Sequence, residues 1–324
     1  MWLLSTDRAE LHEFVSPEAV PGGYAILSHV WDEDEQTFQD TRRFQDEYAA
    51  SKPNPRDRAS PKIRGACMLA EQHGYDWLWI DAPCIDKSSS AEVSEAINSM
   101  YRYYSLAEVC YAYLKDVPHG DIFDREQPAT REAFSKSEWH RRGWTLQELI
   151  ASKIVIFLSR DWTLLGTKAE LADLVESITQ IPASLLGLKT QLAHFSIAQR
   201  MSWAANRKTT REEDRAYSLL GIFGIQMPPL YGEGVQAFYR LQEEIMKRFP
   251  DTSLFAWRPT RPLSTSPDPT LLTLYHHEHS EGTYLFASSP FAFRHSSRIR
   301  FSPPAVIAPQ LGGLQHKVCD ISIS

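Results

Sequence analysis

The sequence is poor in cysteine, and its cysteines are widely spaced. Its 324 residues include four cysteines, at positions 67, 84, 110 and 319. None belongs to a Cys-x-x-Cys pair or lies beside a His-x-x-x-His spacing, which excludes a disulfide framework and the common cysteine-based zinc sites. We therefore expect reduced thiols in an intracellular protein.

Long apolar runs are also lacking. No stretch of about 18 apolar residues occurs, and residues 1–7 (MWLLSTD) become acidic before the apolar core of a signal peptide could form. These features predict a cytoplasmic protein without a membrane span.

The sequence has no excess of positive charge. Lysine and arginine total 34 against 41 aspartates and glutamates, which gives a net charge of −7. Because proteins that bind nucleic acid usually carry a basic footprint, nucleic acid is not expected as the main partner. There is no Gly-x-x-x-x-Gly-Lys-Ser/Thr motif, which excludes a P-loop NTPase, and no ankyrin, tetratricopeptide or WD repeat.

The sequence does contain ample material for a folded core, with 43% hydrophobic residues and nine tryptophans. Short apolar runs alternate with amphipathic segments that begin with helix-capping residues, Ser60 before Pro61 and Ser89 before Glu92. This alternation predicts an α/β fold with a parallel sheet flanked by helices. The predicted strands are residues 24–28, 76–81, 109–114 and 153–158.

Beyond residue 160 the pattern becomes mainly helical. Two capping boxes are predicted, Thr167 with Glu170 and Thr210 with Glu213, and residues 233–249 have the spacing of an amphipathic helix. We therefore divide the chain into an α/β domain (1–160), a helical extension packed on it (161–257) and a C-terminal segment of low order or irregular structure (258–324). The histidines at 276, 277 and 279 are interpreted as a solvated run, and neither a metal site nor a cofactor is predicted.

Polar residues follow the first two predicted strands directly. In open α/β sheets, the loops after the carboxyl ends of strands are where ligands bind, so these side chains are candidates for a binding site. The alternative interpretation is that they only decorate solvated loops. The candidates are Ser28, His29, Trp31 and Asp32 after the first strand, and Asp81, Asp86 and Lys87 after the second.

Glu148 is a carboxylate inside an otherwise apolar helical segment, residues 142–150 (RGWTLQELI). On a helix it shares a face with Trp144, and the segment runs directly into the strand predicted at 153–158. Carboxylates are seldom buried, so the plain alternative is an exposed glutamate near a helix end. Its position at the rim of the sheet makes it the leading candidate for a catalytic residue.

Three blocks of the sequence resemble, in order, those of the fungal heterokaryon incompatibility (HET) domain. They are residues 24–40 (YAILSHVWDEDEQTFQD), 79–114 (beginning WIDAPC) and 142–151 (RGWTLQELIA), so the resemblance covers about residues 20–160. Residues 215–222 (RAYSLLGI) and 229–234 (PLYGEG) resemble what usually follows this domain in vegetative incompatibility-like proteins. The resemblance implies an effector of programmed cell death in fungal non-self recognition.

Two positions depart from the common HET pattern. Asp32 stands where a glycine often follows the tryptophan, and Pro83 stands where a second cysteine often precedes Cys84. Pro83 argues against a catalytic cysteine pair. Asp32 is expected to narrow the loop that follows the strand at 24–28, because its side chain is larger than a glycine.

A more distant resemblance links the chain to Toll/interleukin-1 receptor (TIR) domains. Trp144, Leu146, Glu148 and Leu149 match the Trp-Cys-Leu-x-Glu-Leu helix of plant members, with Thr145 in place of the cysteine. In those proteins the glutamate is required for cleaving NAD. The resemblance implies a flavodoxin-like sheet, Glu148 as the catalytic residue and NAD as substrate.

The remaining candidates would then bind the substrate. Trp31 or Trp144 is expected to stack on nicotinamide, and Lys87 or Arg141 to face the pyrophosphate, although packing or solvation explains each of them equally well.

Two functions from different classes remain open. One is an NAD hydrolase that acts through Glu148. The other is a non-catalytic interaction module that signals death by assembling with itself or with other incompatibility proteins.

Overall fold

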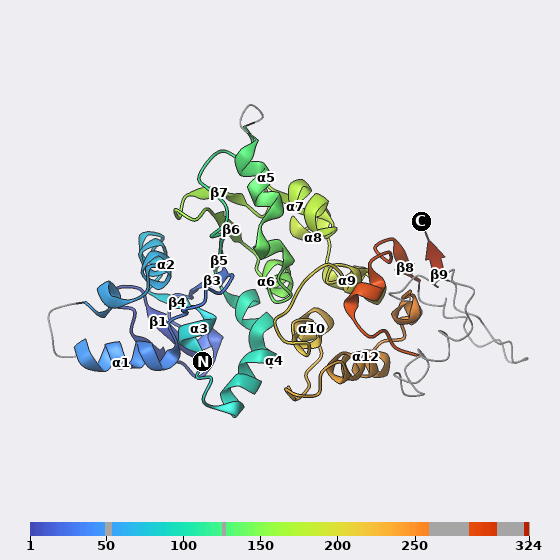
Figure 1. The fold of residues 1–324 in the computed structure, drawn as a ribbon, viewed down its shortest axis with the longest axis horizontal. Coiled ribbons are helices and arrows are strands. Elements are labelled where there is room, and N and C mark those ends of the chain that lie inside the picture. The colour runs from blue at the N-terminus through green and yellow to red at the C-terminus, as the bar shows by residue number, and fades with distance from the viewer. Residues whose placement is uncertain (49–53, 125–127, 259–284, 303–320, 324) are drawn as a thin grey trace, which may run out of the picture.

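The computed structural model describes residues 1–48, 54–124, 128–258, 285–302 and 321–323 (Figure 1). A seven-stranded sheet occupies the N-terminal half, and a group of short helices follows it. Cys319 and the histidines at 276, 277 and 279 lie outside the described residues.

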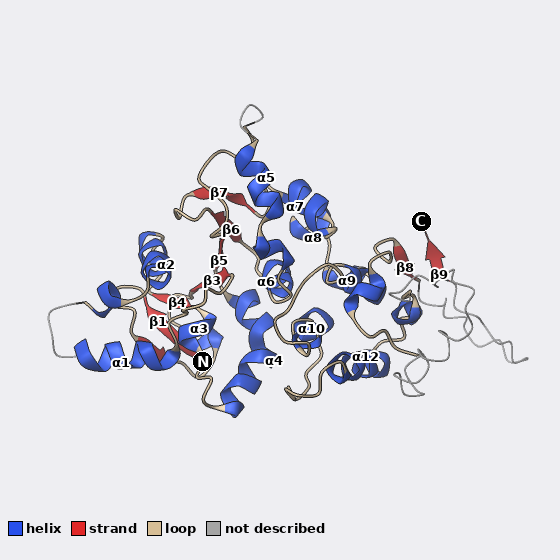
Figure 2. Ribbon diagram, in the orientation of Figure 1, coloured by secondary structure: helices blue, strands red, loops and turns tan. Residues whose placement is uncertain are grey.

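The sheet confirms the predicted α/β class, with strand order β2-β1-β4-β3-β5-β6-β7 (Figure 2). Four adjacent strands run parallel: β4, β3, β5 and β6. If these four are numbered by their order in the chain, their order in the sheet is 2-1-3-4, which is also how a flavodoxin-like sheet begins. The flavodoxin-like arrangement as a whole stays a prediction, because the remaining strands are antiparallel. The strands are Trp2–Ser5 (β1), Leu11–Glu13 (β2), Ala25–His29 (β3), Trp77–Trp79 (β4), Val109–Tyr113 (β5), Val155–Leu158 (β6) and Leu164–Thr167 (β7).

The three antiparallel strands are additions that sequence reasoning did not predict. β1 and β2 cover the edge of the sheet beside β4, and β7 covers the other edge beside β6. Capping both edges limits the unpaired backbone that a parallel sheet exposes. The predicted domain boundary at residue 160 therefore falls between two strands of one sheet.

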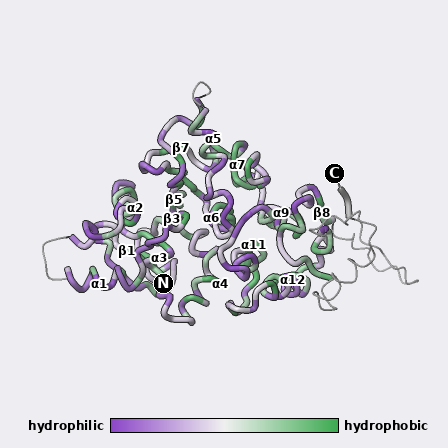
Figure 3. Tube along the Cα trace, viewed as in Figure 1, coloured by the Kyte–Doolittle hydropathy of each residue, from purple (hydrophilic) through white to green (hydrophobic). Residues whose placement is uncertain are grey.

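Helices cover both faces of the parallel strands (Figure 1). Two predicted starts have their expected caps: Ser60 Oγ accepts from Ile63 N at 3.4 Å, and Ser89 Oγ accepts from Glu92 N at 3.3 Å. Figure 3 shows α1 as largely hydrophilic, in keeping with its place at the periphery. The helices of this part are Phe38–Tyr48 (α1), Pro61–Gln72 (α2), Asp81–Cys84 (α3), Ser90–Leu106 (α4), Ala129–Lys136 (α5) and Thr145–Ala151 (α6).

The predicted helical character beyond residue 160 is found after β7. α11 packs against α4 and α6 of the sheet part, and α10 packs on α12. Residues 285–302 contribute a short 3-10 helix, Pro290–Phe293 (η6), and a strand, Ile299–Phe301 (β8), which pairs with Ile321–Ile323 (β9). The helices are Ala172–Thr179 (α7), Ala183–Leu186 (α8), Ile197–Ser202 (α9), Asp214–Tyr217 (α10), Leu220–Phe223 (α11) and Gln236–Arg248 (α12).

Glu213 does not form the predicted capping box with Thr210. Its carboxylate instead accepts from the backbone N–H groups of Gly232 and Gly234, at 2.7 and 3.1 Å. Tyr217 Oη similarly accepts from Leu230 N at 2.7 Å. The predicted cap is wrong because a loop distant in sequence offers Glu213 two donors. As a result, residues 215–222 and 229–234 form one packed unit.

The three described cysteines are buried free thiols. Burial raises the pKa of Cys67 to about 12 and raises the pKa of Cys84 and of Cys110 further, so none is a ready nucleophile.

Among the described helices, none combines the length and apolar character needed to cross a membrane.

Candidate functional site

Glu148 lies inside the protein, at the carboxyl end of the central parallel strand. Helix α6 presents it toward β3, where Ser28 donates a hydrogen bond from Oγ to Glu148 Oε2. Trp139 Nε1 in turn donates to Ser28 Oγ at 2.8 Å. Ser28 and Trp139 are completely buried, and Glu148 keeps 8% of its surface exposed. The plain alternative of an exposed glutamate is therefore wrong.

Burial raises the pKa of Glu148 to about 7. The hydrogen bond from Ser28 acts in the opposite direction, and the negative charge of Asp81 adds to the upward shift. Tyr104 lies against the same carboxyl group and donates its own hydroxyl proton to Leu27 O at 3.0 Å. Glu148 therefore changes its charge near neutral pH, as a catalytic carboxyl group often does.

Trp31, Asp81 and Lys87 form a connected rim outside this buried core. Trp31 Nε1 donates to Asp81 Oδ2 at 2.7 Å, and Lys87 Nζ lies 3.5 Å from the centroid of the Trp31 ring. His29 Nε2 lies 3.8 Å from Asp81 Oδ1 and 3.6 Å from Glu35 Oε1. Because Asp81 also acts on Glu148, the rim and the buried core are electrostatically coupled.

The first loop is held by two lysines from other elements. Lys62 on α2 forms ion pairs with Glu35 and, at 2.7 Å, with Asp32. Lys115, just after β5, pairs with Asp32 at 2.7 Å and donates to Trp31 O at 3.2 Å. Asp32, which replaces the glycine common at this position, thus anchors the loop that carries Trp31.

Six of the candidates come together in this cluster: Ser28, His29, Trp31, Asp81, Lys87 and Glu148. Asp32 anchors the first loop through its ion pairs with Lys62 and Lys115, and the last three candidates lie elsewhere. Asp86 accepts hydrogen bonds from Gln39 Nε2 at 2.6 Å and from Ser88 Oγ at 2.6 Å. Trp144 hydrogen-bonds to the carboxyl group of Asp214 in the helical part. Arg141 lines a separate cavity of about 400 Å³ beside His140 and Trp203.

Sequence reasoning missed four residues of the site: Tyr104, Trp139, Glu35 and Lys62. Tyr104 and Trp139 have the helical spacing of ordinary core residues, and nothing in that spacing shows that Tyr104 lies against a buried carboxyl group or that the Trp139 indole donates to Ser28. Glu35 does stand in the acidic run after the first strand, which was a usable signal. Lys62 reaches the site only through tertiary packing.

Within the described ranges, no group of three histidine, cysteine, aspartate or glutamate side chains is placed to hold a metal ion.

Comparison with known families identifies two segments. The family described as "Heterokaryon incompatibility protein (HET)" matches residues 24–121, and a "Domain of unknown function (DUF8212)" matches residues 236–320. The HET match includes Ser28 and Asp81 and ends before the segment that carries Glu148.

A curated relative supports the same family. The chain is 42% identical over 248 residues to the vegetative incompatibility protein HET-E-1 of Podospora anserina. The matched region covers 74% of this chain and 18% of that protein, so the chain spans less than a fifth of its relative. No solved structure matches the chain. The family match includes the first two of the three sequence blocks, and the relative matches most of the chain. The chain therefore belongs to the heterokaryon incompatibility (HET) family and carries its HET domain in residues 24–121.

Proposed function

We propose that this protein acts in heterokaryon incompatibility as a cell-death effector that hydrolyses NAD through Glu148. The observation that carries the proposal is the carboxyl group of Glu148, buried at the carboxyl end of β3 and hydrogen-bonded by Ser28. The name of the Podospora relative supports the incompatibility role, and the TIR-like motif around Glu148 suggests the reaction.

The chemistry needs one well-placed carboxylate. Breaking the bond between nicotinamide and ribose develops positive charge on the ribose, and a nearby carboxylate stabilises that charge. Water adds to the ribose carbon, neutral nicotinamide leaves with the bonding electron pair, and ADP-ribose and a proton are the other products. Nicotinamide already leaves from a cationic form, so no strong general acid is required.

The rim residues have matching roles in this proposal. Ser28 donates to Oε2 of Glu148 and orients the carboxylate, which acts on the ribose in this proposal. The Trp31 ring, 36% exposed and fixed by Asp81 and Lys87, offers a flat surface for nicotinamide. We propose a cytoplasmic site of action and activation by assembly with further copies or with other incompatibility proteins.

The alternative is a non-catalytic module in which the same contacts only hold α6 against the sheet. The observation that favours it is the burial of Glu148, which leaves little of its surface open to a substrate. The residue is 8% exposed, and the cavities of about 390 and 400 Å³ are lined by other residues. In that case assembly with partners, and no turnover, triggers death.

The experiment that decides is NAD loss over time with purified protein, at high concentration because the proposal includes activation by assembly. Glu148→Gln keeps the size and hydrogen bonding of the side chain and removes its charge, so we expect turnover to fall at least about 100-fold. Glu132→Gln, on the exposed face of α5, is the matched control and is expected to retain full activity. Assembled wild-type protein that consumes no NAD, with both it and Glu148→Gln toxic in cells, would overturn the enzyme proposal.

The reaction should also depend on pH through Glu148. Only the carboxylate form stabilises the developing cation, and the pKa of Glu148 is about 7. Below this pKa we therefore expect the initial rate to increase about ten-fold with each unit by which the pH is raised. Above pH 8 the rate should level off. A rate that stays constant between pH 5.5 and 8 would exclude ionisation of Glu148 as the controlling step.

A further inference from the structure

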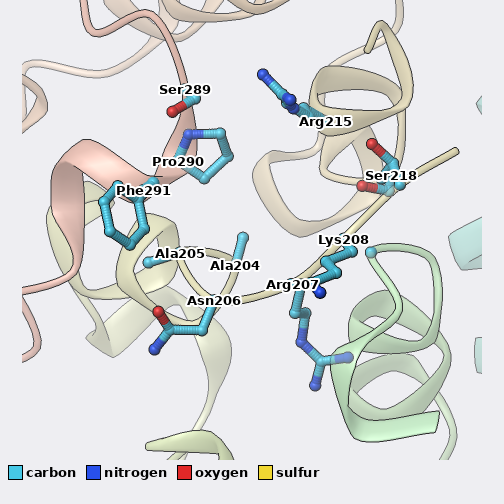
Figure 4. Close-up of a pocket in the computed structure, with 12 residues that line it drawn as sticks. Ala204, Ala205, Asn206, Arg207, Lys208, Arg215, Ser218, Ser289, Pro290 and Phe291 are labelled. Carbon is cyan, nitrogen blue, oxygen red and sulfur yellow. The ribbon is translucent and has the colours of Figure 1, made fainter. Parts of the chain in front are cut away.

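A cavity of about 390 Å³ lies where the segment before α6 meets the helical part (Figure 4). Its walls come from Gly143, from residues 204–209, from Arg215 and Ser218, and from residues 289–291 at the start of η6. None of these residues belongs to the cluster around Glu148. The cavity is within the usual size range of sites for small ligands.

The charged residues that line this cavity are all basic. They are Arg207, Lys208 and Arg215, and no acidic side chain is among the described residues of the lining. Such a concentration needs a reason in a chain whose net charge is −7. Hydroxyl groups of Thr209, Ser218 and Ser289 add further hydrogen-bonding capacity.

The backbone fixes Lys208 in place. Its N–H donates to Arg141 O at 2.6 Å, and its carbonyl accepts from Gly143 N at 2.8 Å. A Cβ added at Gly143 would lie 2.5 Å from Thr209 Cγ2, so a larger residue here would displace the Thr209 side chain. The side chain of Lys208, by contrast, forms no ion pair with any residue that the structure describes.

Arg207 adds a positive charge that is not fully satisfied. Its Nη1 donates to Arg142 O at 2.8 Å and to Thr145 Oγ1 at 2.9 Å. Its Nη2 is buried and has no hydrogen-bond partner among the described residues. Burial lowers the pKa of Arg207 to about 9 and the negative charge of Glu148 opposes that shift, so the guanidinium stays charged at neutral pH.

Arg215 has a partner that an incoming anion can replace. It pairs with Glu212 at 3.0 Å, three residues earlier, and both side chains are close to half exposed. Ion pairs of this kind contribute little, so exchange of Glu212 for a phosphate costs little. Figure 4 shows Arg215 and Ser289 on one side of the cavity and Lys208 on another.

Opposite the cations, the wall is apolar. Phe291 keeps 41% of its surface exposed, and Pro290 and Ala205 lie beside it (Figure 4). An exposed aromatic ring facing a group of cations suits a ligand that carries a flat ring at one end and phosphate at the other.

We propose that this cavity binds a nucleoside diphosphate, with the diphosphate on Lys208 and Arg215 and the base against Phe291. The site is separate from the Glu148 cluster, and the proposal does not depend on NAD hydrolysis.

The test is calorimetric titration of the whole protein with ADP, pyrophosphate and adenosine. ADP should bind, pyrophosphate more weakly, and adenosine without measurable heat. Lys208→Gln combined with Arg215→Gln should weaken ADP binding at least ten-fold, while Lys189→Gln, an exposed lysine outside the cavity, should leave it unchanged. Phe291→Ala should weaken ADP and leave pyrophosphate unaffected, because it removes only the surface for the base.

Each other outcome overturns part or all of the proposal. Absence of ADP binding, or ADP binding that survives the double substitution, would show that the cavity does not hold a nucleotide. ADP binding that is lost in Trp31→Ala and kept in the double variant would place the nucleotide at the Glu148 cluster. Equal binding of pyrophosphate and ADP would reduce the site to an anion site. The titration needs no turnover, so an inactive HET domain leaves its result interpretable.

Discussion

Glu148→Gln is expected to stabilise the folded protein increasingly as pH rises, although it removes the residue proposed for catalysis. Burial raises the pKa of Glu148 from 4.5 to about 7, so the folded state holds this proton more tightly than the unfolded chain does. The resulting stabilisation is complete below pH 4.5 and is lost as pH rises through 7. At about 1.4 kcal/mol per pKa unit, the group contributes a change of roughly 3 kcal/mol over this interval.

Glutamine cannot ionise and so escapes this penalty. Its carbonyl can accept from Ser28, and its amide can donate to Tyr104 Oη, whose own proton goes to Leu27 O. Urea unfolding of the two proteins at pH 4.5 and at pH 8 measures the effect. The free energy of unfolding of the variant, minus that of wild type, should increase by about 3 kcal/mol between the two pH values.

Glu132→Gln serves as the control, because Glu132 is exposed and its one ion pair among the described residues is with Lys136 on the same helix. Its difference from wild type should stay nearly constant over the same range, because solvent screens an exposed ion pair. If Glu148→Gln is instead less stable than wild type, and most so at pH 8, then hydrogen-bond partners stabilise the ionised Glu148 by more than burial destabilises it. A variant that is inactive and yet more stable at pH 8 would separate lost chemistry from lost folding.

The position of the site could be predicted because two local rules apply to it. Parallel strands bring their carboxyl ends to one edge, so Ser28 and Asp81 were expected at the same edge of the sheet once both strands were recognised. Glu148 was conspicuous because a carboxylate interrupted an apolar helix. That Glu148 lies beside Ser28 and Asp81 could not be predicted, because it depends on the order of the strands in the sheet. The order of the strands along the chain does not give their order in the sheet.

The other parts of the site depend on contacts between distant segments. Trp139 reaches Ser28 across 111 positions of the chain, and Lys115 reaches Asp32 across 83. Neither residue type is unusual in its local pattern. Arg141 and Trp144 lie close to Glu148 in sequence and still face other parts of the molecule, because the backbone of residues 141–143 pairs with Lys208 just before α6 begins.

Gly221→Ala is expected to destabilise the protein by about 3 kcal/mol, because overpacking at a rigid contact costs this much. Helix α11 crosses α4 at this glycine, and a Cβ there would lie 2.1 Å from Tyr101 Cβ and 2.6 Å from Tyr101 Cγ. A Cβ atom cannot rotate away from its own backbone, so relief requires α11 to move as a unit. Leu220, Ile222 and Phe223 beside it are at most 1% exposed, and their packing would be lost.

The measurement is the midpoint of urea unfolding at neutral pH, with Gly187→Ala as the control. Gly187 has no positive φ, and a Cβ there meets its nearest neighbour, Ala183 O, at 3.2 Å, so the control should change stability by less than about 1 kcal/mol. An unchanged midpoint in Gly221→Ala would show that α11 and α4 are further apart than the structure places them. Because α11 also contacts α6, a loss of stability here would explain why residues 215–222 accompany the Glu148 motif in one chain: they hold the helix that carries the candidate catalytic residue.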